Sequence, residues 1–184
     1  MATSPLMSKR VLCLLVDGFE ETEAVTPVNL MRRGGIEVVM ASLHGGVVEG
    51  RGGMRLEPDE DFANIDPQSF DLLFLPGGPG VMDLLADGRA TTLAREFQEA
   101  GKPVAAICAA PLILHEAGLL KTHRYTAHFS VQGKLPAALD ERVVEDGLIL
   151  TSRGAGTAVD FGLMLVRRLA GEAVARDVAE AIMA

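Results

Sequence analysis

The chain has no tryptophan, one tyrosine, two cysteines and no long apolar run among its 184 residues. So few cysteines exclude a disulfide scaffold, and the short apolar runs predict no membrane-spanning helix. The formal net charge of −8 argues against a nucleic-acid partner, because phosphate recognition needs a basic face. The four histidines are scattered singly, without the spacing of a metal site. We therefore expect no bound metal, and small molecules or proteins as partners.

The length is typical of one domain, which buries roughly 70% of its unfolded surface. Residues 1–8 contain no apolar core of signal-peptide length, so they predict a flexible N-terminal tail before a single domain over residues 9–184. The absence of a secretion signal favours the cytoplasm, where both cysteines would stay reduced. We expect Cys13 to be a core thiol of the first strand.

Short apolar runs alternate with helical patterns along most of the chain. Strands are predicted over residues 11–16, 36–42, 72–75 and 104–107, and helices over residues 20–33, 91–100, 111–117, 157–169 and 174–182. The strand patterns are continuously apolar, which is typical of a parallel sheet covered on both faces. The sequence therefore predicts a three-layer α/β sandwich with a mostly parallel, flavodoxin-like sheet and helices on both faces.

Two other segments predict antiparallel pairs. Residues 143–145 and 148–151 flank Asp146-Gly147, which is a strong signal for a two-residue hairpin turn. Residues 43–65 contain five glycines around short β-like pieces, and we interpret them as a small hairpin excursion. Such an excursion is a candidate dimer contact.

Cys108 follows the strand pattern of residues 104–107 and precedes a helical pattern that begins at Pro111. Small residues, Ala106 and Ala110, stand two positions on either side of it. This spacing suits a nucleophile elbow, in which a tight turn pushes the middle side chain outward. A helix starting just after the cysteine would favour a thiolate. The alternative from this segment alone is a buried structural cysteine.

Polar or glycine-rich segments follow three other strands. They are residues 17–23, which are rich in carboxylates; residues 76–80, which are rich in glycine; and residues 152–157, which contain Arg153. In an open α/β sheet, ligands bind outside the carboxyl ends of the strands. A thiol, a carboxyl, backbone N–H donors and an arginine would thus meet at one edge. Taken singly, the carboxylates are also typical helix-dipole partners, and the glycines are typical of tight turns.

Five ordered motifs carry a resemblance to a known family. They are residues 18–25, 31–36, 75–78, 105–111 and 150–154. Together they resemble the ThiJ/PfpI superfamily and, within it, the DJ-one branch of small parkinsonism-associated and bacterial homologues. The likeness spans nearly the whole chain and implies a homodimer.

The resemblance implies roles for particular residues. Cys108 is similar to the reactive nucleophile of the family, Glu23 to the carboxylic acid that contacts it, and His128 to a histidine on the same pocket wall. The oxyanion and substrate position would be lined by Gly77, Gly78, the amide of Ala109, and Arg153.

The chain also departs from the family pattern. The peptidase branch has a histidine directly after its cysteine, whereas this chain has Ala109, which disfavours proteolysis. Phe129 and Ala155 occupy places where the DJ-one branch often carries proline. The shape of the pocket and its substrate preference therefore do not follow from the resemblance.

The function implied is that of a cofactor-independent cysteine enzyme of the glyoxalase III or deglycase type, acting on reactive dicarbonyls or early glycation adducts. Cys108 would attack as a thiolate beside a protonated Glu23. The alternative is an oxidative-stress redox sensor or redox-linked chaperone, in which Cys108 is oxidised to a sulfinate. An amidotransferase-like glutaminase is disfavoured, because such a domain depends on a synthetase partner.

Overall fold

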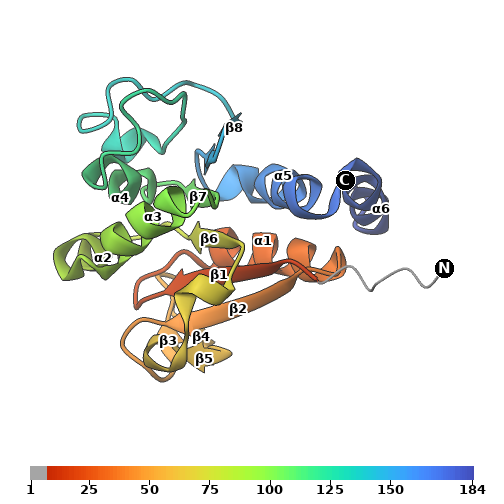
Figure 1. The fold of residues 1–184 in the computed structure, drawn as a ribbon, viewed down its shortest axis with the longest axis horizontal. Coiled ribbons are helices and arrows are strands. Elements are labelled where there is room, and N and C mark those ends of the chain that lie inside the picture. The colour runs from red at the N-terminus through yellow and green to blue at the C-terminus, as the bar shows by residue number, and fades with distance from the viewer. Residues whose placement is uncertain (1–7) are drawn as a thin grey trace.

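The computed structural model describes residues 8–184, and most of the predicted tail over residues 1–8 lies outside the described residues. A seven-stranded sheet occupies the centre (Figure 1). Its strands are β1 (Arg10–Leu15), β2 (Glu37–Ser42), β5 (Glu60–Asp61), β6 (Leu72–Leu75), β7 (Val104–Ile107), β8 (Val143–Asp146) and β9 (Ile149–Ser152). The order is β5-β2-β1-β6-β7-β9-β8, and every pair is parallel except β8 with β9. The predicted mostly parallel sheet is confirmed.

Helices cover both faces of the sheet, as the sequence predicts. They are α1 (Glu21–Arg33), α2 (Val81–Asp87), α3 (Arg89–Glu99), α4 (Pro111–Glu116), α5 (Ala158–Ala170) and α6 (Glu172–Ala181). One core packs α1, α5 and α6 against the sheet, and the other packs α2, α3 and α4. Alternate residues of β1 point into different cores: Leu12 lies in the second, whereas Cys13 lies fully buried in the first. No helix among the described residues is long and apolar enough to cross a membrane.

The glycine-rich excursion forms a small hairpin of β3 (Val48–Glu49) and β4 (Arg55–Leu56), as predicted. The hairpin of β8 and β9 is also present, but its turn comes one residue later than expected. Asp146 pairs with Ile149, so Gly147 and Leu148 form the connection. Gly147 has a φ of 63°, the left-handed conformation that glycine adopts at little cost.

The sequence patterns missed two elements for local reasons. Helix α2 has only seven residues and is separated from α3 by Gly88, whose φ of 82° caps the first helix. Its short apolar pattern is too brief to show a helical period. Strand β5 has two acidic residues and pairs only with the end of β2. It therefore carries no apolar strand signal.

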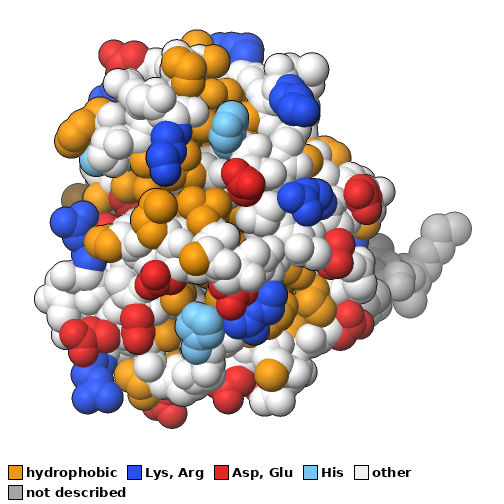
Figure 2. All heavy atoms as spheres, turned by 90° about the vertical axis from the view of Figure 1, so that its left-hand side faces the viewer, with side chains coloured by type: hydrophobic (Ala, Val, Ile, Leu, Met, Phe, Trp, Pro, Cys, Tyr) orange, Lys and Arg blue, Asp and Glu red, His pale blue; other side chains and the backbone are white. Residues whose placement is uncertain are grey.

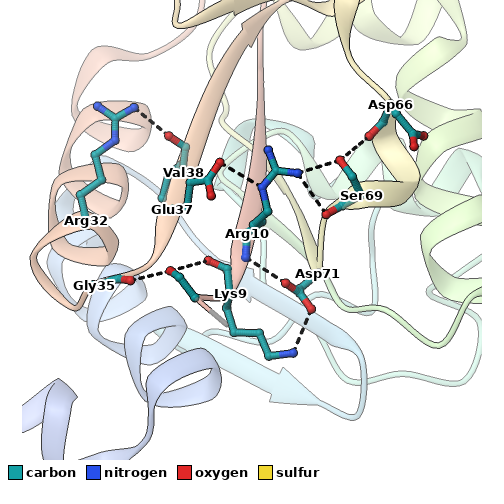
Figure 3. Close-up of polar contacts among 10 residues, drawn as sticks. Lys9, Arg10, Arg32, Gly35, Glu37, Val38, Asp66, Ser69 and Asp71 are labelled. Carbon is teal, nitrogen blue, oxygen red and sulfur yellow. Dashed lines mark hydrogen bonds and ion pairs between the residues drawn. The ribbon is translucent and has the colours of Figure 1, made fainter. Parts of the chain in front are cut away.

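Polar contacts tie the amino ends of the strands together (Figure 3). Arg10 Nε donates to Glu37 at 2.9 Å, which links β1 to β2. Asp71, just before β6, accepts from the Arg10 amide at 2.9 Å and from Lys9 Nζ at 2.9 Å. Ser8 Oγ donates to the Gly35 carbonyl at 2.7 Å. These exposed pairs add little stability each, but they join three neighbouring chain segments at this edge.

A ligand site is expected at the opposite end of the sheet, where the carboxyl ends of the parallel strands lie. Strand β1 lies between β2 and β6. The next strand, β2, is added on one side of β1, and the later strands β6, β7 and β9 are added on the other side. Ligands of open α/β sheets bind outside the carboxyl ends of the strands at such a switch point. The segments that follow β1, β6, β7 and β9 therefore meet at one place.

Candidate active site

Cys108 stands at the sharp turn between β7 and α4. Its φ of 66° is left-handed, which costs a non-glycine residue about 1–3 kcal/mol. Hydrogen bonds hold the turn: the Cys108 amide donates to the Ser152 carbonyl at 2.8 Å, and the Ala110 amide donates to the Ile107 carbonyl at 3.0 Å. Only 8% of the residue surface is exposed. The backbone thus has the geometry of the nucleophile elbow that the spacing predicts.

Glu23 reaches the same place from the first turn of α1. The Glu20 carboxylate caps this helix by accepting from the Glu23 amide at 2.7 Å. The Glu23 side chain contacts the Cys108 thiol, and Oε2 is buried without a hydrogen bond of standard geometry. Burial, together with the charge of Glu20, raises the pKa of Glu23 to about 7 from an ordinary 4.5. The expected protonation of Glu23 therefore agrees with its surroundings below pH 7.

Two glycines after β6 allow this close approach. A side chain at Gly77 would overlap Glu23 Oε2 and lie 2.6 Å from Cys108 Cβ. Gly78 has a φ of 102°, and a side chain there would collide with the backbone between Gly18 and Glu20. The Gly77 amide lies beside the Glu23 carboxyl and lowers its pKa, whereas the Gly78 amide lies beside the sulfur of Cys108 and lowers the pKa of the thiol. Gly77 thus lies against Glu23, and the amide of Gly78 lies against Cys108.

The pKa of the Cys108 thiol depends on its burial and on the charge of Glu23. Burial, and then the adjacent Glu23 carboxylate, raise the pKa of Cys108 to about 12, although the amides of Gly78 and Ala109 act in the opposite direction. Helix α4 has only six residues, so its dipole gives the sulfur little support. An ionised Glu23 therefore disfavours the thiolate, which is why the sequence-based prediction pairs a thiolate with a protonated Glu23. Above pH 7 the pair holds one proton, and the predicted form is the one with that proton on Glu23.

His128 forms another wall of the site. Its amide donates to the Cys108 carbonyl at 2.8 Å, which places it directly beside the elbow. The Ser130 amide donates to His128 Nδ1 at 3.3 Å, so the proton of the neutral ring is on Nε2. Burial, and then the charge of Arg51, lower the pKa of His128 below its ordinary value of 6.5. The ring is therefore neutral near pH 7.

A cavity of about 330 Å³ opens over Cys108. Its lining includes Gly78, Ala109 and His128, and also two residues that sequence reasoning missed, Arg51 and Met82. Figure 2 shows this side of the molecule, where hydrophobic side chains gather across the middle among charged ones. Arg51 belongs to the small hairpin, and its amide donates to the Phe19 carbonyl at 2.8 Å. No spacing rule connects that hairpin to the elbow.

Arg153 does not line the cavity over Cys108. It lines an adjoining cavity of about 520 Å³, and its Nη1 donates to Asp140 Oδ1 at 2.6 Å. Phe129 and Ala155, the two departures from the family pattern, line this second cavity as well. The structure thus brings Cys108, Glu23 and His128 together, whereas Arg153 lines the second cavity, which it shares with His128 but not with Cys108. Among residues 8–184, no group of three or more histidine, cysteine or acidic side chains is arranged to hold a metal ion.

Comparisons with known proteins agree with this architecture. The model of the DJ-1/PfpI family matches residues 9–168. The chain is 34% identical over 183 residues to protein dj-1beta of Drosophila melanogaster, covering 96% of this chain and 98% of the relative. It is 34% identical over 151 residues to the deglycase PfpI of Pyrococcus furiosus, covering 80% and 91%. The crystal structure of Drosophila DJ-1beta covers the same 96% and 98% with a TM-score of 0.92.

Proposed function

The chain belongs to the DJ-1/PfpI family, and on this premise we propose that it is a cofactor-independent cysteine enzyme acting on reactive dicarbonyls or early glycation adducts. Relatives named as deglycases support an enzymatic role. The observation that carries the proposal is the contact between the Cys108 thiol and the buried Glu23 carboxyl at the end of the sheet. This pair combines a nucleophile with an acid–base group.

The first step is attack on the aldehyde carbon of a substrate such as methylglyoxal. The thiol proton passes from Cys108 to the Glu23 carboxylate while the sulfur–carbon bond forms. The carbonyl electron pair moves to oxygen, and the amides of Gly78 and Ala109, which lie beside the sulfur, would stabilise that charge. Glu23 then gives its proton to this oxygen, which produces a hemithioacetal.

The second step moves hydrogen between the two carbons. Glu23 takes the proton from the carbon bonded to sulfur and returns it to the neighbouring carbonyl carbon. The hydroxyl proton passes between the two oxygens, so the product is a thioester of a 2-hydroxy acid. Water then attacks the thioester, and the thiol leaves with a proton. Methylglyoxal plus water thus gives lactate, without an external oxidant.

The test is lactate formation from methylglyoxal in the absence of glutathione. We expect Cys108→Ser to lose nearly all activity, because a serine hydroxyl is a much weaker nucleophile than a thiol. Cys13→Ala is the matched control, since it removes the other free thiol, which lies fully buried in β1. Activity that persists in Cys108→Ser would contradict the proposed nucleophile.

The same surroundings favour a second role, in which Cys108 senses oxidants. A sulfinate formed by two equivalents of peroxide would meet the amides of Gly78 and Ala109 and the Glu23 carboxyl. A structure of Toxoplasma gondii DJ-1, described as oxidized, has a TM-score of 0.90 to this chain at 27% identity. Mass spectrometry after mild peroxide treatment tests the role, because modification that spares Cys108 would rule it out. Protection of a denaturing client by the oxidised form would test the chaperone role.

We also propose a homodimer formed through α1 and the β3–β4 hairpin. Val25 of α1 is 44% exposed, and Met54 of the hairpin is 67% exposed. Both are exposed apolar side chains of the two segments that the proposed interface would bury. The cytoplasm stays our prediction for the location, since the proposed chemistry needs a reduced thiol.

A further inference from the structure

The second cavity joins the proposed reaction site without being used by it. Its volume is about 520 Å³, and its lining includes Phe129, Asp140, Arg142, Arg153 and Thr157. His128 lines both this cavity and the one over Cys108. A molecule that reached from Cys108 into the second cavity would pass beside His128.

Strand pairing brings the two cavities together. Ile107 of β7 pairs with Ser152 of β9 in the parallel register, so Cys108 and Arg153 leave neighbouring strands at the same level. Neighbouring strands lie about 5 Å apart. A chain of a few carbon atoms is thus long enough to join a carbonyl at Cys108 to a group in the second cavity.

The second cavity brings two cationic side chains together in a chain that is acidic overall. It contains two arginines and one aspartate, in a chain whose formal net charge is −8. Arg142 is held in place, because its Nε donates to Asp160 at 2.7 Å and its Nη2 donates to the Gly156 carbonyl at 3.0 Å. With Asp140 and Asp160 counted, the two arginines are balanced by two carboxylates, so an anionic group can bind here only by taking the place of one of them.

Of the two arginines, Arg153 is the one whose present partner a ligand can replace more easily. Its carboxylate partner, Asp140, has a side chain that is 93% exposed. Exposed ion pairs contribute about 0–1 kcal/mol, so a substrate carboxylate can replace Asp140 at little cost. The planar guanidinium binds carboxylates through two parallel hydrogen bonds.

We propose that this cavity, defined by Asp140, Arg142 and Arg153, binds the carboxylate of a substrate whose carbonyl reacts at Cys108. The inference rests on the proposed function and names its substrate class: 2-oxoaldehydes or glycation adducts that carry a carboxylate a few carbons from the reactive carbonyl. The smallest dicarbonyls leave this cavity empty.

A matched pair of substrates tests the preference. Both 4,5-dioxopentanoate and 2-oxopentanal present the same 2-oxoaldehyde, but only the first ends in a carboxylate. We expect kcat/KM to be about fivefold higher for the charged substrate, since an ion pair with the partly exposed Arg153 contributes up to about 1 kcal/mol. Arg153→Met should reduce this ratio to about one. Arg124→Met is the control, because Arg124 pairs with Glu141 outside the cavity and its loss should keep the ratio.

A binding measurement separates this inference from the proposed activity. Calorimetric titration compares 4-oxopentanoate with 2-pentanone, neither of which has the reactive aldehyde. We expect 4-oxopentanoate to bind the wild-type protein about fivefold more tightly than 2-pentanone does, and both probes to bind Arg153→Met with the same low affinity. Equal binding of both probes to the wild type would overturn the subsite. Turnover of neither 2-oxoaldehyde, with the binding difference intact, would instead overturn the proposed function alone.

Discussion

Glu23 and Cys108 form a coupled pair in which the proton belongs to both residues. Burial raises the pKa of Glu23 to about 7 and that of Cys108 to about 12. Between these values the pair holds one proton, either on sulfur or on the carboxyl, and the two forms cannot be told apart by a pH titration of the rate. The singly protonated pair is the state that can both attack and transfer a proton.

This coupling predicts the pH dependence of activity. We expect kcat/KM to rise as the pH increases through about 7, because the doubly protonated pair lacks a base to accept the thiol proton. The rate should then level off up to about pH 9. Steady-state assays in constant ionic strength measure this profile. A rate that rises only above pH 8, as for an ordinary thiol, would mean that Glu23 is not the base.

The raised pKa of Glu23 also predicts a pH-dependent stability. The folded protein binds this proton more tightly than the unfolded chain, so the stabilisation is complete below pH 4.5 and disappears as the pH rises through 7. A shift from 4.5 to about 7 corresponds to about 3 kcal/mol. Glu23→Gln removes the titrating group. Between pH 4 and pH 8, the unfolding free energy of this variant should therefore fall by about 3 kcal/mol less than that of the wild type.

Urea unfolding at several pH values measures the difference. Glu180→Gln is the control, because this exposed carboxyl lies at the end of α6, far along the chain from the elbow. If wild type and Glu23→Gln lose stability in parallel over this range, the Glu23 proton has no role in folding.

At the scale of elements, the packing of α1 against α5 positions Glu23. Gly162 of α5 faces α1, and a side chain there would lie 2.7 Å from Leu30 Cδ1 and 3.0 Å from Pro27 Cα. Pro27 offers backbone atoms that cannot rotate away, so the two helices would have to separate. The small residue therefore sets how closely α1, and with it Glu23, packs against α5.

Gly162→Ala should accordingly destabilise the protein by about 1–3 kcal/mol, as overpacking does in other cores. The displacement of α1 should also lower the catalytic rate. Thermal unfolding and the lactate assay measure the two effects. Gly133→Ala is the matched control, because nothing lies within 4 Å of its new methyl group. Equal stability of both variants would show that α1 and α5 accommodate the added methyl group without separating.

At the scale of the whole molecule, the proposed dimer predicts a mass twice the 19.5 kDa of the chain. Light scattering after size-exclusion chromatography measures this mass. Val25→Glu and Met54→Glu should each favour the monomer, because a charge would be buried in the proposed interface. Met183→Glu is the control, since Met183 is 95% exposed at the C-terminal end. A monomeric wild type, or dimers that survive both substitutions, would contradict this interface.

The sequence by itself determined the fold class, most of the elements and the turn at Cys108. Those features depend on local rules: apolar runs for buried strands, small residues around the elbow, and Asp-Gly for a hairpin. Patterns too short to show a period, such as α2 and β5, were missed for the same reason.

Only the tertiary structure decided which groups meet and in which protonation state. The sulfur's high pKa arises from burial and from Glu23, and neither can be calculated from the few residues around Cys108. The approach of Arg51 to the site and the placement of Arg153 in a separate cavity depend on how distant segments pack. Electrostatic energies depend on distance and solvent exposure, which are properties of the folded chain.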